Sequence, residues 1–291
     1  MFASEAPWAV PPAVQCVPRQ AWRNGSASSG ERTLADEVPI AFSYDGATHA
    51  VLMATPADLE DFALGFSYTE GIVAAPAEIA ELAIVSVADG IVLRMWLTGD
   101  RSDAFAARRR RFVGPAGCGM CGLESLAEAS RVIPMARCDL RISRQDIGEA
   151  VAALPARQQL NMLTRAVHAA AYWEPDRGLV LREDVGRHNA LDKLAGTLLR
   201  TGRSAAEGII VLSSRISIEL VQKAGMMGAA IVVGVSAPTA VAVRTAEAAG
   251  LTLVGVARDD GSIRNGSHDI SREMRWTSRR FCCPGFSSDQ P

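Results

Sequence analysis

The second half of the chain contains four apolar runs that restrict its fold more than any other feature: GLVLRED, GIIVLSSR, AAIVVGVSAP and LTLVGVARDD. They are rich in Val, Ile and Leu and hardly alternate with polar residues, which is typical of strands buried on both faces. Between them stand three stretches of helical periodicity, HNALDKLAGTLLR, SIELVQKAGMMG and TAVAVRTAEAAG, which suit the crossovers between parallel strands. We therefore predict the α/β fold class, with a three-layer domain on a parallel-type sheet over residues 150–261.

The first half predicts a small α+β domain over residues 35–112. Two pairs of apolar runs flank the Asp-Gly dipeptides at residues 45–46 and 89–90, which tolerate the positive φ angles of tight hairpin turns. Between the hairpins, TPAD at residues 55–58 precedes LEDFALGF, whose apolar positions have helical spacing. We expect Thr55 to cap this helix, because a Ser or Thr before an apolar periodic run is a common helix start.

The two ends of the chain lack such periodicity. We expect residues 1–34 to form a loose N-terminal tail and residues 262–291 an irregular C-terminal tail. Residues 113–149 contain a glycine-rich C-x-x-C loop and the stretch LESLAEASRVIPM, which predicts a connecting helix.

Composition excludes several classes of protein. A formal net charge of -2 and a pI near 6.1 provide no global basic field, so we expect no general binding of nucleic acid. Six cysteines in 291 residues are too few for a disulfide scaffold, and the first residues do not resemble a secretory signal. No apolar run reaches the roughly 18 residues needed to span a bilayer. We therefore expect a cytoplasmic protein without a membrane segment.

Polar side chains follow the ends of the four apolar runs. Among them are Arg187, Ser213, Arg215, Thr239 and Arg258. Each could simply cap a helix or solvate the surface. However, the carboxyl ends of parallel strands share one edge of a sheet, where helix N-termini present free N–H groups. Together these residues predict a phosphate-binding edge.

The segment GPAGCGMCG places Cys118 and Cys121 among glycines, shortly after four consecutive arginines at residues 108–111. Such a pair can bind zinc, exchange disulfides, lie buried without a chemical role, or carry sulfur. Zinc requires four ligands, and neither a second C-x-x-C nor a pair of histidines stands at a suitable spacing, so we predict no metal site. A sulfur carrier requires a thiolate that can swing between partners, which the arginines and glycines favour. Thiol redox chemistry, or a zinc-stapled module that binds a nucleotide-containing cofactor, stays open as an alternative.

Several longer segments resemble one family, the formate dehydrogenase accessory sulfurtransferases or FdhD family. They extend from about Glu37 to Gly261 and are EVPIAF, ATPADLEDFALGFSYTEGI, CGMCG, VGRHNALDKL, SSRISIELVQKA and SAPTAVAVRTAEAAGLTLVGVAR. The resemblance implies a larger domain similar to cytidine deaminases. It also implies a homodimer.

The function that the resemblance implies is sulfur transfer. A cysteine desulfurase would supply sulfane sulfur, Cys118 would carry it as a persulfide with the help of Cys121, and formate dehydrogenase would receive it. The acceptor would be the bis(molybdopterin guanine dinucleotide) cofactor of that enzyme, with molybdenum or tungsten, which the family also binds. Its nucleotide phosphates are then expected at the strand ends, against Arg187, Ser213, Arg215, Thr239, Val256, Ala257, Arg258, Asp259, Asp260 and Gly261.

The likeness to cytidine deaminases raises zinc-dependent deamination as another activity. That chemistry needs H-x-E followed by P-C-x-x-C, whereas His188 is followed by Asn and Ala and no P-C-x-x-C comes after it. We therefore interpret His188 as a loop or capping residue, and Asp192 and Lys193 as a solvated pair on a helix surface. One departure from the family concerns Ser214, because the usual residue there is glycine and a side chain is expected to crowd a phosphate.

Overall fold

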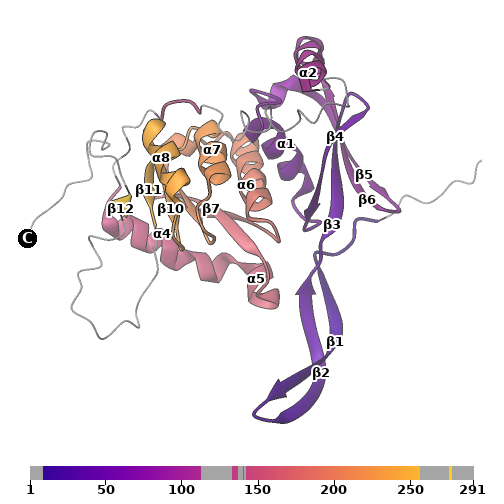
Figure 1. Cartoon of the computed structure of the whole chain (residues 1–291), viewed down its shortest axis with the longest axis vertical. Coiled ribbons are helices and arrows are strands. Elements are labelled where there is room, and N and C mark those ends of the chain that lie inside the picture. Colours follow the sequence, from indigo (N-terminus) through magenta and orange to yellow (C-terminus); the bar gives the residue numbers. More distant parts are fainter. Residues whose placement is uncertain (1–8, 113–132, 137–139, 141, 256–274, 277–291) are drawn as a thin grey trace, which may run out of the picture.

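The described residues form a four-stranded sheet, a six-stranded sheet and a separate two-stranded N-terminal hairpin (Figure 1). The structure is a computed structural model that describes residues 9–112, 133–136, 140, 142–255 and 275–276. Cys118, Cys121 and the segment Val256–Gly261 lie outside the described residues. So does the connecting helix expected over residues 123–135, except for its last three residues, which are not helical. The expected C-terminal tail is described only at Arg275–Trp276.

The smaller sheet has the strand order β4-β3-β6-β5. Its strands are β3 (Val38–Tyr44), β4 (Ala47–Ala54), β5 (Ile79–Val87) and β6 (Gly90–Leu97). Both predicted hairpins are confirmed, and Asp45 and Gly46 have the positive φ angles of 49° and 80° that their turn requires.

Helices α1 (Leu59–Thr69) and α2 (Gly99–Phe112) follow the two hairpins of this sheet, and a short 3-10 turn, η1 (Pro76–Glu78), precedes β5. Helix α1 packs on one face of the sheet through a core that includes Phe42, Phe62, Phe66, Ile91 and Leu93. The predicted role of Thr55 is wrong. Asp58 precedes α1 without a side-chain cap, and Thr55 instead bonds to residues of the second half of the chain.

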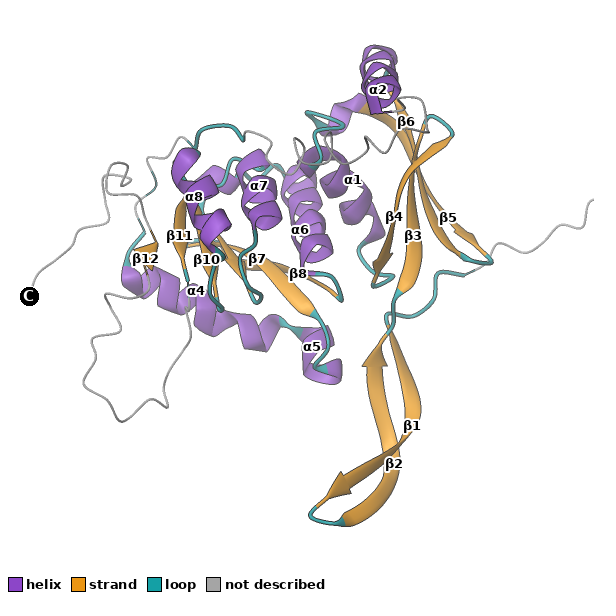
Figure 2. Cartoon of the chain, viewed as in Figure 1, coloured by secondary structure: helices purple, strands orange, loops and turns teal. Residues whose placement is uncertain are grey.

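The larger sheet has the order β12-β11-β10-β9-β7-β8 (Figure 2). Its strands are β7 (His168–Glu174), β8 (Gly178–Asp184), β9 (Ile209–Leu212), β10 (Ile231–Gly234), β11 (Thr252–Val254) and β12 (Arg275–Trp276). The four predicted strands run in one direction, but β7 lies antiparallel between β8 and β9, so the sheet is mixed. Strand β7 escaped prediction because HAAAY is rich in alanine, which favours helices unless tertiary packing overrides it.

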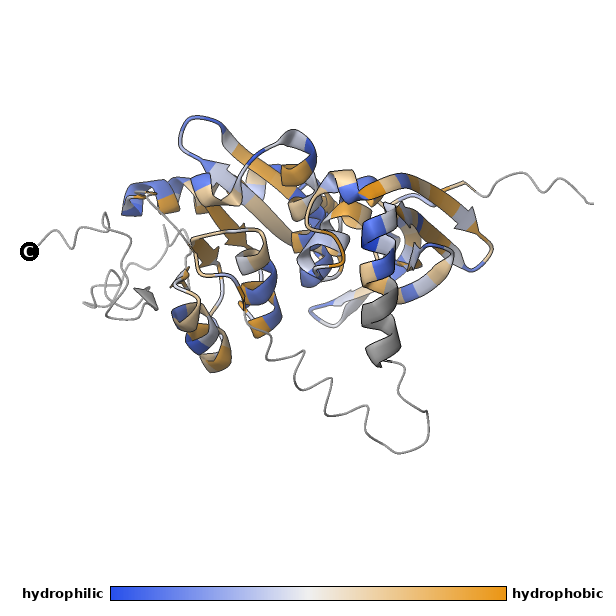
Figure 3. Ribbon diagram, turned by 90° about the horizontal axis from the view of Figure 1, so that it is seen from above, coloured by the Kyte–Doolittle hydropathy of each residue, from blue (hydrophilic) through white to orange (hydrophobic). Residues whose placement is uncertain are grey.

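Helices cover both faces of this sheet, which confirms three layers. On one face lie α6 (Arg187–Thr201), α7 (Ile218–Met226) and α8 (Ala240–Ala248), while α4 (Arg144–Arg157) packs on the other and continues into α5 (Gln159–Thr164). A short 3-10 turn, η2 (Ala205–Glu207), precedes β9. Seen from above, the central strands are coloured as hydrophobic between helices that carry hydrophilic stretches (Figure 3). Helix α4 runs across the domain boundary predicted at residue 150, because its apolar side chains belong to the core of the larger sheet.

The N-terminal hairpin corrects the expectation of a loose tail over residues 1–34. Strands β1 (Val14–Arg23) and β2 (Ser26–Ala35) pair along their whole length and extend beyond both sheets, while Arg32 of β2 bonds to the end of α5 (Figure 1). Asn24 and Gly25 form the turn with φ angles of 50° and 79°. An Asn-Gly turn is a strong hairpin signal, but the flanking strands are mostly exposed and polar, so no apolar alternation accompanies it.

Helices α1 and α6 join the two halves of the chain at a close contact between two glycines. A Cβ atom built on Gly65 would lie 1.7 Å from the carbonyl oxygen of Asp192, and one on Gly196 would lie 1.9 Å from that of Asp61. Any larger residue must therefore push the helix backbones apart. The two halves consequently meet through backbone rather than through interposed side chains at this point.

Candidate functional site

The predicted phosphate-binding residues lie at one edge of the larger sheet. Strands β8, β9 and β10 end there, and the antiparallel β7 begins there, since His168 pairs with Asp184 and Ala170 with Leu212. An isolated bridge between Ile216 and Pro238 continues this edge beyond the strands. The described residues Arg187, Ser213, Arg215 and Thr239 all stand in the loops or helix starts that follow these strands.

These four residues have different local roles. Arg187 is the first residue of α6, and its buried Nε has no hydrogen-bond partner among the described residues. Ser213 Oγ accepts from the backbone N–H of Ala169 at 2.8 Å, and Thr239 Oγ1 caps α8 by accepting from the N–H of Ala242. Both hydroxyls keep a proton to donate. Arg215 is exposed, so the two arginines offer the charge at this edge and the hydroxyls shape the loops.

The side chain of Ser214, which is expected to crowd a phosphate at this edge, is part of its own turn. Its side chain is buried, and its Oγ donates to the carbonyl oxygen of Arg215 at 3.0 Å. The hydroxyl is therefore taken up by the turn itself.

Two histidines that the sequence analysis did not assign to the site also lie here. His168 begins β7, and its pKa is lowered by burial and by the charge of Arg187, against the opposing effect of Asp184. The pKa of His188 is lowered by the same two causes, although its Nε2 lies 3.6 Å from Glu219 Oε2 and 3.4 Å from Ser217 Oγ. Both imidazoles are consequently neutral at pH 7, when each has one donor and one acceptor nitrogen. No sequence signal separates them from His49, which lies on β4 of the other sheet.

Asp184 holds the loop that leads to Arg187. Its Oδ1 accepts from the N–H of Gly186 at 2.7 Å and from Nδ2 of Asn189 at 2.9 Å. Its Oδ2 lies 2.6 Å from Lys193 Nζ, and both side chains are completely buried. The start of α6 is thereby tied to the end of β8.

The same ion pair reaches into the first half of the chain. Lys193 Nζ donates to the carbonyl oxygen of Thr55 at 2.8 Å, while the N–H of Thr55 donates to Asp184 Oδ2 at 3.0 Å. Thr55 Oγ1 also accepts from the N–H of Val185. The expectation that Lys193 lies on a helix surface is therefore wrong, because the face of α6 that carries it is covered by the connection between β4 and α1.

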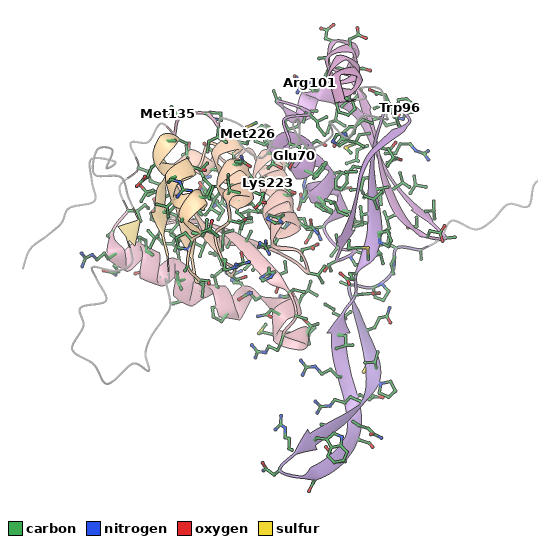
Figure 4. All side chains as sticks on the ribbon, viewed as in Figure 1. Glu70, Trp96, Arg101, Met135, Lys223 and Met226 are labelled. Atoms are coloured by element: carbon green, nitrogen blue, oxygen red, sulfur yellow. The ribbon has the colours of Figure 1, made fainter. Side chains whose placement is uncertain are left out.

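Asp192 is buried in a second cluster, in which a buried lysine again pairs with an aspartate and bonds to the first half of the chain. Lys223 Nζ on α7 lies 2.9 Å from Asp192 Oδ1 and 2.6 Å from Glu70 Oε1 at the end of α1, and Figure 4 shows Glu70 and Lys223 side by side. Thr69 Oγ1 donates to Asp192 Oδ1 at 2.6 Å. Burial lowers the pKa of Lys223, but the negative charges of Asp192 and Glu70 have the larger combined effect. The pKa of this ammonium is therefore raised above its usual value. These charges have structural partners, so they are not available to a ligand.

The chain is similar to known proteins of one family over most of its length. A family model described as FdhD/NarQ family matches residues 35–264, which is most of the chain. The chain belongs to the FdhD/NarQ family. Its relatives include proteins named sulfur carrier protein FdhD from Agrobacterium fabrum, 49% identical over 246 residues, and from Cupriavidus necator, 43% identical over 250 residues. These alignments cover 84% and 86% of this chain and 91% and 85% of the relatives, respectively.

A solved structure has the same fold. It comes from Desulfotalea psychrophila and is described as a candidate formate dehydrogenase accessory protein. The TM-score is 0.67 with 24% sequence identity, over 85% of this chain and 94% of the other. The FdhD/NarQ match also includes Cys118, Cys121 and residues 256–261, whose sequence belongs to the family although they are not among the described residues.

Two features are absent from the described residues. Within those ranges, no group of three or more His, Cys, Asp or Glu side chains is arranged to hold a metal ion. No helix in the same ranges is long and apolar enough to cross a membrane.

The lowered pKa of His168 predicts a loss of stability on mild acidification. Below the ordinary histidine pKa of about 6.5, the unfolded chain binds a proton at this residue before the folded chain does, so the free energy of unfolding falls as pH falls. The variant His168→Gln lacks this contribution and should lose less stability between pH 7.5 and pH 5.5 than the wild type. Urea denaturation at several pH values in this range gives the free energy of unfolding of both proteins. If that free energy falls equally with pH in the wild type and in His168→Gln, His168 titrates normally in the folded state.

Proposed function

We propose that this member of the FdhD/NarQ family is a sulfur carrier that receives sulfane sulfur from a cysteine desulfurase and delivers it to the cofactor of formate dehydrogenase. The names of its relatives support the carrier role, and the C-x-x-C pair provides the thiols that the role requires. Cys118 carries the sulfur as a persulfide and Cys121 assists. The reducing cytoplasm keeps both thiols available, and a homodimer is the proposed form.

The first transfer is a thiol–persulfide exchange. The Cys118 thiolate attacks the terminal sulfur of the donor persulfide, a new S–S bond forms, and the bond to the donor cysteine breaks. The donor leaves as a thiolate, so one sulfane sulfur moves and no external oxidant or reductant is consumed. The sequence places four arginines, residues 108–111, a few positions before Cys118, and positive charge close to a cysteine favours its thiolate.

The acceptor is bound as a substrate, the bis(molybdopterin guanine dinucleotide) cofactor with molybdenum or tungsten. One observation supports a place for its nucleotide phosphates: the buried Nε of Arg187 has no partner among the described residues, at an edge that also carries Ser213, Arg215 and Thr239. A buried donor without a partner costs free energy, which a phosphate oxygen would recover. Residues 256–261, which follow β11 in the sequence, stay part of the proposed binding set. Neutral His168 and His188 are suited to bind the base or ribose through hydrogen bonds.

Binding of GDP, as a fragment of the cofactor, tests this edge. A charge-assisted hydrogen bond to phosphate contributes about 1.5–3 kcal/mol, so Arg187→Ala and Arg215→Ala should each weaken GDP binding about tenfold to a hundredfold. Arg258→Ala should do the same. Isothermal titration calorimetry gives the affinities, and Arg94→Ala serves as a control because Arg94 is exposed on β6 of the other sheet. An absence of GDP binding in the wild type, or an equal effect of all four substitutions, would place the nucleotide elsewhere.

The carrier role predicts a labile sulfur on Cys118. After incubation with a cysteine desulfurase and cysteine, the protein should gain about 32 Da for each added sulfur atom, and Cys118→Ala should not. Cys16→Ala is the matched control and should gain the same mass as the wild type. Cys16 is exposed on β1, but the carboxylate of Glu31 beside its thiol raises its pKa and disfavours the thiolate. Whole-protein mass spectrometry detects the adduct, and persulfide formation that survives Cys118→Ala together with Cys121→Ala contradicts the assignment.

A further inference from the structure

The N-terminal hairpin carries three arginines on one of its faces. Side chains alternate along each strand, and the register pairs Val17 with Arg32, Arg19 with Gly30 and Arg23 with Ser26. Arg19, Arg23 and Arg32 therefore share a face, which we call the arginine face. In Figure 1 the hairpin extends beyond both sheets, so this face lies outside the cores of the molecule.

The arginine face has no acidic counterpart. The same register places Glu31 opposite Pro18, on the other face, where its carboxylate accepts from Cys16 Sγ at 3.5 Å. In the described part of the chain, no ion pair joins any of the three arginines to a carboxylate. The chain as a whole is slightly acidic, so this concentration of positive charge is local.

Exposed apolar side chains adjoin the arginine face. Arg32 Nη2 donates to the carbonyl oxygen of Thr164 at 2.9 Å, which places this face beside α5. There Met162 and Leu163 are 49% and 58% exposed, and Leu34, on the arginine face itself, is 42% exposed.

A groove continues from α5 along the edge strand β8. It has a volume of about 550 Å³ and is lined by Ala13, Arg157, Leu160 and Leu163, together with the β8 residues 179–183. Ala13 directly precedes β1, so the groove leads to the base of the hairpin. Arg157 is exposed and adds a positive charge to this surface. The other charged residues that line the groove are bonded within the chain, Arg182 to Asp58 and Glu183 to the N–H groups of Leu160 and Asn161.

We propose that the arginine face and α5 form a docking surface for an acidic polypeptide segment of a partner protein, one that also carries apolar side chains. Acidic residues would pair with Arg19, Arg23 and Arg32, while apolar residues would cover Leu34 and Leu163. A single-stranded nucleic acid also carries negative charge, but its bases need aromatic side chains to stack on, and Trp22 lies on the opposite face of the hairpin. Two strands exposed on both faces are marginally stable alone, so docking would also stabilise the hairpin.

Fluorescence anisotropy with a defined peptide tests the proposal. The probe is a fluorescein-labelled 16-residue peptide of Asp, Glu and Leu, titrated with the full-length protein. The triple variant Arg19→Glu, Arg23→Glu, Arg32→Glu should bind it at least tenfold more weakly than the wild type. The control Arg94→Glu, Arg144→Glu, Arg244→Glu changes the net charge equally at exposed sites on β6, α4 and α8, and should bind nearly as well as the wild type.

A second variant separates the apolar part from the charges. Leu163→Ser keeps every arginine and should weaken binding about threefold or more, while GDP binding and the thermal melting temperature stay as in the wild type. Equal loss in both triple variants, no peptide binding by the wild type, or tighter binding of an oligothymidine of the same charge would each overturn the proposal. Because GDP binding is measured in parallel, failure of the docking surface is distinguishable from failure of the nucleotide site.

Discussion

The ion pair between Asp184 and Lys193 holds the start of α6, and with it Arg187 of the candidate site, against both halves of the chain. It links β8, α6 and the connection from β4 to α1 at a point without solvent. Removing two charges from water costs several kcal/mol for each ion, and the cost is offset only when the remaining hydrogen-bonding capacity is used. Both oxygens of Asp184 are fully engaged, and Lys193 Nζ additionally lies 5.3 Å from the ring centroid of Phe62.

Further buried charges extend this connection along the contact between α1 and α6. Asp61 on α1 binds Arg182, Arg200 and Thr197, and these partners lower its pKa although burial opposes them. At the other end of α1, Lys223 forms ion pairs with both Asp192 and Glu70. Between these clusters the two helices touch at glycines, so the helices cannot slide without separating oppositely charged groups. The start of α6, and Arg187 with it, is therefore held in place by residues from both halves of the chain.

The sequence alone predicts the strands whose residues are continuously apolar, such as β9 and β10, and the hairpins with Asp-Gly turns. It also predicts that Arg187, Ser213, Arg215 and Thr239 meet at one sheet edge, because chain direction determines where strands end. It fails where tertiary contacts decide the outcome. Alanine-rich β7 is a strand because it pairs with β8 and β9 on either side. Lys193 has the sequence position of a helix-surface residue, but the connection between β4 and α1 buries it. The roles of Cys118, Cys121 and residues 256–261 stay predictions that come from motif and resemblance.

A double-mutant cycle on Asp184 and Lys193 tests most directly whether this pair holds the two halves together. The free energy of unfolding is measured by urea denaturation for Asp184→Asn, Lys193→Met and the double variant. Each single substitution should cost about 3–5 kcal/mol because it leaves a buried charge without its partner, and the double variant should cost much less than the two together. A coupling energy of about 2 kcal/mol or more is the predicted result. Costs that add to within about 0.5 kcal/mol would contradict the account, because they would show that the two charges act independently.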